Sequence, residues 1–126
     1  MKLNHETTPG QQRITAYDAT QVSVDGTPHA LPLALDAQQI LADWRPASAD
    51  SLAADDIAAL LTLRPGVVLI GTGSRQRLIH PAILRPLIDA GIGYEVMDLG
   101  AACRTFNLLV AEGRAVAVAL LGDPAQ

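Results

Sequence analysis

The chain has 126 residues, of which 49% are hydrophobic and 17% charged, and its formal net charge is -4 at pH 7. This length suits one domain with a core of its own, and the composition excludes an intrinsically disordered chain. The nine basic residues are scattered and aromatic residues make up only 3%. The sequence therefore lacks the basic patches and stacking platforms of a nucleic-acid-binding protein.

The sequence also bounds the compartment. Cys103 is the single cysteine, which excludes an internal disulfide and a paired-cysteine metal site. The opening MKLNHETTPGQQ has neither the apolar segment of a secretory signal nor the pattern of a mitochondrial presequence. The longest apolar runs, GVVLIG and AVAVALLG, are far shorter than the roughly 20 residues of a membrane span. We predict a cytoplasmic protein that does not itself insert into a membrane.

The N-terminal third has the patterns of β-structure. Residues 1–12 are polar and predict a flexible arm, followed by a single domain over residues 13–126. Alternating apolar residues flank the pair Asp25-Gly26, which favours a hairpin turn. In the segment ALPLAL that follows, Pro32 lacks a backbone donor, so this segment predicts a short edge strand.

The rest of the chain alternates between helical and strand patterns. Asp50 or Ser51 is the predicted cap of a helix that runs to about Leu63. The run VVLIG, residues 67–71, has no polar alternation and indicates a strand covered on both faces. The same reasoning predicts a helix from Pro81 to before Gly91, a strand over 94–97, a helix over 101–112 and a strand over 115–121. This order predicts a layered α/β domain.

Two glycines follow the buried strand in the segment IGTGSRQ, residues 70–76. Ligands often bind at the carboxyl ends of strands, and backbone N–H groups here, with Ser74 and Arg75 or Arg77, can hold a small anion. The segment departs from the dinucleotide fingerprint, because Gln76 stands where the third glycine belongs, and it lacks the Lys-Ser/Thr of a phosphate-binding loop. The alternative is a tight turn whose glycines allow positive φ or a close backbone approach.

A cysteine stands near the start of the last predicted helix. A helix N-terminus can lower the pKa of a thiol, as a nucleophile requires. However, Cys103 shares its helical face with Phe106 and Val110, which makes an inert core thiol the favoured interpretation.

Arg104 and Asn107 lie on a different face of that helix. An arginine beside an amide can bind a carboxylate or a phosphate. It can equally cap carbonyl groups or pair with Asp98. The sequence leaves the binding and the structural interpretation open.

No set of residues forms a complete catalytic or metal-binding pattern. His5, His29 and His80 do not have the spacing of metal ligands, and no Ser-His-Asp arrangement can be assembled. The pair Asp55-Asp56 is explained by the positive end of a helix dipole. We expect no metal, no cofactor and no catalytic residue, which favours a protein that is not an enzyme.

Several motifs are similar to those of a known family. The segments VVLIGTGS and GIGYEVMDLGAACRTFNLLVAEGRAVAVALL, with the hairpin before them, resemble a bacterial member of the small domain family that includes mitochondrial complex I (NADH dehydrogenase) assembly factor three. The resemblance covers roughly residues 14–121. The matching positions are Gly71, Thr72, Gly73, Met97, Asp98, Ala101, Ala102, Arg104, Thr105, Asn107, Glu112, Gly113 and Arg114.

The resemblance implies a three-layer domain with a β-hairpin plus helix, a mixed central sheet, and a layer of helices. It also implies association with other proteins during complex assembly, without an established reaction. We therefore expect a non-enzymatic interaction module that assists the assembly or stability of a partner, which can be membrane-associated. The alternative is a small anionic-ligand-binding protein, or an unrecognised enzyme, that uses the GTG loop with Arg104 and Asn107.

The predicted binding site is a corner where the GTG loop, a helix N-terminus and a guanidinium meet. All three favour an anion such as a phosphate, a sulfate or a partner's carboxylate. The apolar composition and an unguarded hairpin edge also favour a homodimer. The residues of the predicted corner are Gly71, Thr72, Gly73, Ser74, Asp98, Arg104 and Asn107.

Overall fold

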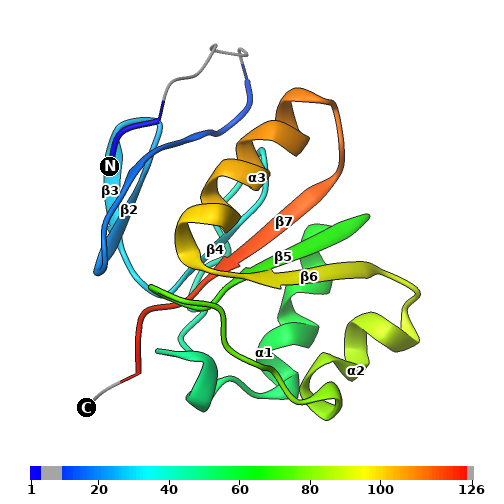
Figure 1. Ribbon diagram of the computed structural model, residues 1–126. Helices are drawn as coiled ribbons and strands as arrows, with labels where there is room; N and C mark the ends of the chain where they lie inside the picture. The colour runs from blue at the N-terminus through cyan, green and yellow to red at the C-terminus, as the bar shows by residue number, and fades with distance from the viewer. Residues whose placement is uncertain (4–9, 125–126) are drawn as a thin grey trace.

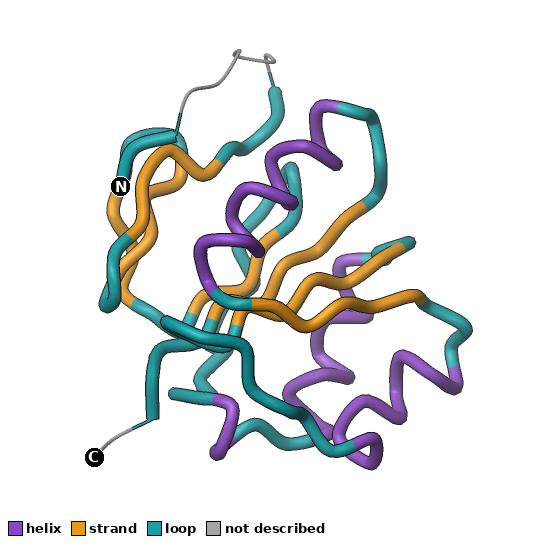
Figure 2. Tube along the Cα trace, viewed as in Figure 1, coloured by secondary structure: helices purple, strands orange, loops and turns teal. Residues whose placement is uncertain are grey.

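The elements of secondary structure stack in three layers in the computed structural model, which describes residues 1–3 and 10–124 (Figure 1). One layer contains a three-stranded sheet and helix α3 (Leu99–Ala111), and the opposite layer contains α1 (Ala54–Ala59) and α2 (Pro81–Asp89). Figure 2 shows these helices on the two sides of the central strands. The predicted α/β class is confirmed.

The central sheet has the strand order β4-β7-β5-β6. Strand β5 runs parallel to both β6 and β7, whereas β4 runs antiparallel to β7. The predicted edge strand after Pro32 is therefore confirmed as β4. The bounds are β4 (Leu33–Leu35), β5 (Val67–Gly71), β6 (Gly93–Met97) and β7 (Val116–Leu120).

Two apolar cores fill the spaces between the layers. Successive side chains of a strand point to opposite faces of its sheet. Accordingly, Leu69 of β5 packs in the core with Phe106 of α3, whereas Val68 and Ile70 pack in the core with Leu87 of α2. Because both faces of β5 are buried, its sequence needs no polar alternation.

The three-stranded sheet consists of β1 (Ile14–Tyr17), β2 (Gln21–Val24) and β3 (Thr27–Ala30). Asp25 and Gly26 form the turn between β2 and β3 with φ values of 51° and 84°, as the hairpin prediction requires.

The outer edges of the hairpin layer are protected. An exposed hairpin edge therefore no longer supports the predicted homodimer. Met1 and Leu3 exchange backbone hydrogen bonds with β1, although they belong to the predicted arm, whose residues 4–9 lie outside the described residues. On the other edge, Pro28 of β3 has no N–H to offer to a further strand.

The predicted start of the first helix is wrong. Asp50 and Ser51 belong to a separate 3-10 turn, and α1 begins at Ala54. The Asp56 carboxylate accepts a hydrogen bond from the Ala53 N–H at 2.8 Å. The Asp56 N–H in turn donates to the Ala53 carbonyl at 3.0 Å, so both groups are satisfied although the N-cap residue has no polar side chain.

Other helix boundaries follow the sequence signals closely. A 3-10 segment after α1 ends at Leu63, as predicted. The His80 ring accepts a hydrogen bond from the Ala82 N–H at 3.0 Å and caps α2. Helix α3 starts two residues before its predicted start because Asp98 is its N-cap.

Candidate functional site

The GTG turn and the start of α3 lie side by side at one edge of the central sheet. The parallel strands β5 and β6 both end there. The Thr72 N–H donates to the Met97 carbonyl at 2.9 Å, and the Leu99 N–H donates to the Gly73 carbonyl at 2.7 Å. The GTG turn and the start of α3 therefore form one hydrogen-bonded unit.

The two glycines of the turn have structural roles. A Cβ atom at Gly71 would lie 2.9 Å from the Cβ of Ala102, so the missing side chain lets α3 pack closely on β5. Gly73 has a φ of 94°, which residues with side chains rarely adopt. Between them, the buried Thr72 hydroxyl donates to the Arg75 carbonyl at 2.8 Å and accepts from the Arg77 N–H at 2.9 Å. These contacts hold the loop in shape.

A carboxylate of the chain itself occupies the loop. The backbone N–H and the hydroxyl of Ser74 both donate to Oδ1 of Asp123, at 2.8 and 3.0 Å. The Ser74 N–H is the main cause that lowers the pKa of Asp123, and the positive charges of Arg77 and Arg75 add to it. The loop thus has the groups for holding a carboxylate, and Asp123 fills that position.

Arg104 reaches across from α3 to the hairpin layer. One terminal nitrogen of its exposed guanidinium donates to the Tyr17 hydroxyl at 3.0 Å. Gly100, one turn earlier, makes room for this contact, because a Cβ atom there would lie 2.5 Å from the same hydroxyl oxygen. Sequence reasoning missed Tyr17, and the glycine in the first turn of a helix was the available signal.

A pocket of about 260 Å³ lies where the hairpin layer meets this corner. The Asp98 carboxylate on its wall accepts a hydrogen bond from the Ala101 N–H at 2.8 Å. The corner therefore combines an arginine with two carboxylates, those of Asp98 and Asp123. The pocket is lined by Tyr17, Ala19, Gly73, Ser74, Asp98, Leu99 and Gly100.

Asn107 does not line this pocket. Its side chain is buried against β1, where Oδ1 accepts from the Ile14 N–H at 2.9 Å and Nδ2 donates to the Ile14 carbonyl at 2.8 Å. Both ends of the amide are thereby engaged with one residue of the hairpin layer. In this geometry Asn107 fastens the hairpin to α3.

The single thiol of the chain lies in the core. Cys103 is fully buried, which confirms the predicted core position. Burial raises its pKa from the ordinary value of 9.0 to about 12, against the opposing effect of the neighbouring Arg104 charge. A nucleophile needs an exposed thiolate, so this environment is unsuited to thiol chemistry.

We expect native protein to react slowly with a thiol reagent at neutral pH, and Cys103→Ala to cost about 1 to 2 kcal/mol of stability.

The stability of the protein should also depend on pH through this thiol. Because the pKa of Cys103 is raised in the folded state, the unfolded chain loses the thiol proton first, and stability falls as pH rises from 9.0 towards 12. Denaturant titrations on both sides of pH 9 measure this loss, and Cys103→Ala should not show it. Rapid labelling of the native protein would contradict the buried position.

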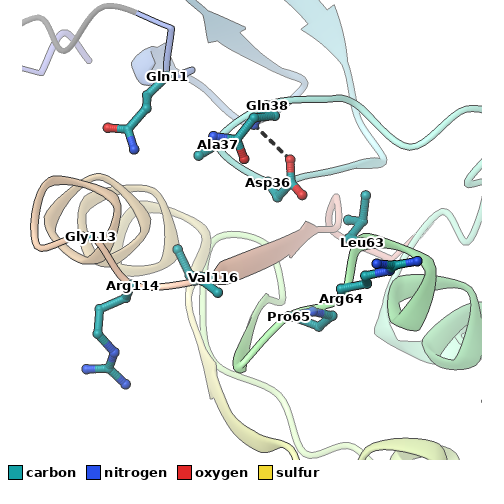
Figure 3. Close-up of a pocket in the computed structure, with 11 residues that line it drawn as sticks. Gln11, Asp36, Ala37, Gln38, Leu63, Arg64, Pro65, Gly113, Arg114 and Val116 are labelled. Atoms are coloured by element: carbon teal, nitrogen blue, oxygen red, sulfur yellow. Dashed lines mark hydrogen bonds between the residues drawn. The ribbon is translucent and has the colours of Figure 1, made fainter.

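A second pocket, of about 310 Å³, lies at the opposite ends of β5 and β7, next to the end of α3 (Figure 3). Its lining includes Gly113 and Arg114, to which the sequence assigned no site. In Figure 3 the Arg114 guanidinium points away from the hollow, and the Asp36 carboxylate accepts hydrogen bonds from the N–H groups of Gln38 and Gln39. Arg64 lines the pocket as well, but with Arg114 directed away from the hollow the two arginines do not converge on one position, as an anion site requires.

Neither a metal site nor a membrane-spanning helix is found in residues 1–3 and 10–124. This part of the chain contains no group of three or more His, Cys, Asp or Glu side chains that could hold a metal ion. His5, one of the three histidines, lies outside it. The helices described here are also too short or too polar to cross a bilayer.

Comparison with known proteins establishes the family. The family described as "Protein of unknown function (DUF498/DUF598)" matches residues 14–121. The chain belongs to this family. The similarity inferred from the GTG, MD and EGR motifs is thereby confirmed.

Relatives of this DUF498 chain include proteins with assembly-factor names. The chain is 31% identical over 126 residues to "NADH dehydrogenase [ubiquinone] 1 alpha subcomplex assembly factor 3" of Bos taurus, covering 98% of the chain and 68% of the relative. The human protein of the same name is 30% identical over 113 residues, covering 88% of the chain and 61% of the relative. The chain thus spans about two thirds of the length of these relatives.

Bacterial proteins are similar to the chain in sequence, and two solved bacterial structures are similar to it in fold. A Francisella tularensis protein named "13 kDa major membrane protein" is 34% identical over 92 residues, covering 71% of the chain and 74% of the relative. A crystal structure from Bordetella parapertussis matches with a TM-score of 0.84 at 36% identity, covering 93% of this chain and all of that one. A Bordetella pertussis structure described as a Mth938-like domain matches with a TM-score of 0.81 at 31% identity, covering 98% and 94%.

Proposed function

We propose that this DUF498 chain is a non-enzymatic interaction module that assists the assembly or stability of a partner protein complex. The observation that carries the proposal is the similarity over 98% of the chain to a protein named as a complex I assembly factor. The aligned region covers the hairpin layer, the central sheet and both helical layers, so the whole domain is what the relatives share.

The polar groups of the corner support a binding role more than a catalytic one. The Ser74 hydroxyl and the Asp98 carboxylate are engaged within the chain, and the His80 ring caps α2. The Cys103 thiol is buried with a raised pKa. General acid–base or nucleophilic catalysis needs a group that is free to reach the substrate.

Arg104 is the proposed contact with the partner. It is exposed, and a guanidinium has five N–H donors, of which the contact with Tyr17 uses one. The remaining donors can take a carboxylate of the partner in the two-point geometry that arginine favours. We place the protein in the cytoplasm with a partner that can be membrane-associated. The name "13 kDa major membrane protein" of the Francisella relative supports the link to a membrane and says nothing of the cytoplasm.

Affinity capture from native cell extract, followed by mass spectrometry, tests this proposal. We expect Arg104→Ala to retain the fold and to weaken capture of the partner by about 1.5 to 3 kcal/mol, the range for a hydrogen bond to a charged group. Arg85→Ala is the matched control, since Arg85 is an exposed arginine on α2. Unfolding of Arg104→Ala without any change in binding would assign the guanidinium a structural role instead.

A second candidate is a small anionic ligand in the corner pocket, whose lining residue Tyr17 contacts Arg104. The variant Asp123→Ala tests it, because it removes the carboxylate that accepts the Ser74 N–H. Phosphate, sulfate and acetate should then raise the melting temperature of Asp123→Ala more than that of the unmodified protein. Equal melting temperatures with and without each anion would exclude this candidate.

A further inference from the structure

Three of the four outer strand edges in the two sheets are blocked. Met1 and Leu3 bond to β1, and Pro28 interrupts the donors of β3. On the central sheet, the Leu41 N–H donates to the Ala34 carbonyl at 2.8 Å, which covers the outer edge of β4. Proteins protect exposed edges in these ways because unpaired N–H and C=O groups readily accept a further strand.

The fourth edge, that of β6, is open. The Met97 carbonyl accepts the Thr72 N–H from the β5 side, and backbone groups alternate along a strand. The N–H and C=O groups of Tyr94 and Val96 therefore point away from β5. Within the described part of the chain these groups have no hydrogen-bond partner, and the five residues of β6 include no proline.

The two faces of this edge differ in chemistry. Tyr94, which is 37% exposed, and Val96 lie on the face towards α2, where Val96 packs against the core. Glu95 is exposed on the opposite face and has no ion-pair partner among the described residues. The edge thus presents an apolar, an acidic and an apolar residue in succession.

A second copy of the chain fits this edge poorly. If two β6 strands paired antiparallel through both outward residues, Tyr94 would face Val96 of the other copy. Glu95 would then stand directly opposite its own equivalent. Like charges in directly opposed positions destabilise a strand pair.

We infer that the β6 edge is a docking site for an extended segment of a partner protein, which adds a fifth strand to the central sheet. The segment has an apolar–basic–apolar pattern opposite Tyr94, Glu95 and Val96. Main-chain hydrogen bonds provide the affinity in this mode of recognition, and alternate side chains provide the specificity. This inference is independent of the proposed contact at Arg104. The variant Arg104→Ala leaves the backbone of β6 unchanged, so loss of binding at one site does not imply loss at the other.

Amide hydrogen exchange gives the first test. In the free protein, the amides of Tyr94 and Val96 should exchange much faster than those of Glu95 and Met97, which face β5. Slow exchange at all four positions in the monomer would show that the edge is already covered and would overturn the inference.

Binding is tested with the capped peptide Ser-Thr-Val-Lys-Val-Thr-Ser and a twin that has Glu in place of Lys. Titration should protect the Tyr94 and Val96 amides, and the Lys peptide should bind about two- to fivefold more tightly than its twin. In Glu95→Lys this preference should reverse. Equal binding of both peptides, or protection elsewhere on the molecule, would overturn the docking site.

A matched pair of variants at Tyr94 separates the contribution of the backbone N–H to peptide binding from that of the side chain. Tyr94→Pro removes the outward N–H and should weaken peptide binding by about two- to tenfold, whereas Tyr94→Thr retains the N–H and should bind more tightly than Tyr94→Pro. If Tyr94→Pro does not fold, the charge reversal at Glu95 still decides the question. Protection of both amides that grows with protein concentration, together with a doubled mass in light scattering, would identify a second copy as the occupant and overturn the assignment to a partner.

Discussion

Replacing Phe106 with alanine is expected to lower the free energy of unfolding by about 3 to 5 kcal/mol. Phe106 has no exposed surface and lies in the core between α3, the hairpin layer and the central sheet. It is the single phenylalanine of a chain with few aromatic residues, and the other buried members of its core cluster are aliphatic side chains and Cys103. Since these elements are held by other contacts, they cannot collapse fully into the space that the ring leaves.

Denaturant unfolding monitored by circular dichroism measures this effect. Leu108→Ala is the control, because Leu108 is on the same helix but 58% exposed, and its cost should stay within about 0.5 kcal/mol. A Phe106→Ala protein as stable as Leu108→Ala would mean that α3 does not pack on the sheet as described.

The second large effect is expected for Asn107→Ala. The substitution removes both partners of Ile14 in the interior, and each unpaired buried group costs about 1 to 3 kcal/mol. We therefore expect a loss of about 2 to 6 kcal/mol in the free energy of unfolding. Thr105→Ala is a suitable control, since Thr105 is only half-buried on the same helix.

Amide exchange resolves where the stability of Asn107→Ala is lost. Because the amide links α3 to β1, the protection of the Ile14 amide should fall more than that of β5. A uniform loss across the domain, or no loss at all, would argue against this role. If binding of a partner changes while stability does not, Asn107 belongs to the interaction surface after all.

Most polar groups of the corner are engaged in contacts within the chain. Its loop groups hold Asp123, and its arginine holds Tyr17. Arg104 is left as the exposed group that can exchange an internal contact for one with a partner. The open β6 edge ends at this same corner, since Asp98 follows Met97 directly in the chain.

Features that depend on neighbouring residues could be predicted from the sequence. The turn at Asp25-Gly26 and the buried run of β5 rest on local dihedral preferences and periodicity. The start of α1 was missed because the side chain of Asp56, inside the helix, supplies the cap. The local sequence was compatible with a helix capped by Asp50 or Ser51 and with one that begins at Ala54.

The sequence by itself determined the α/β class and, through its ordered motifs, the family, whereas the adjacency of the GTG turn to the start of α3 required the pairing of β5 with β6. Only the tertiary structure decided which group each polar side chain contacts. Arg104 and Tyr17 are 87 positions apart, Asn107 and Ile14 are 93 apart, and Ser74 and Asp123 are 49 apart. Helix and strand periodicity assigns a residue to a face of its own element, but its partner depends on which elements pack together. The openness of the β6 edge has the same origin, because it depends on the strand order and on what covers the other three edges.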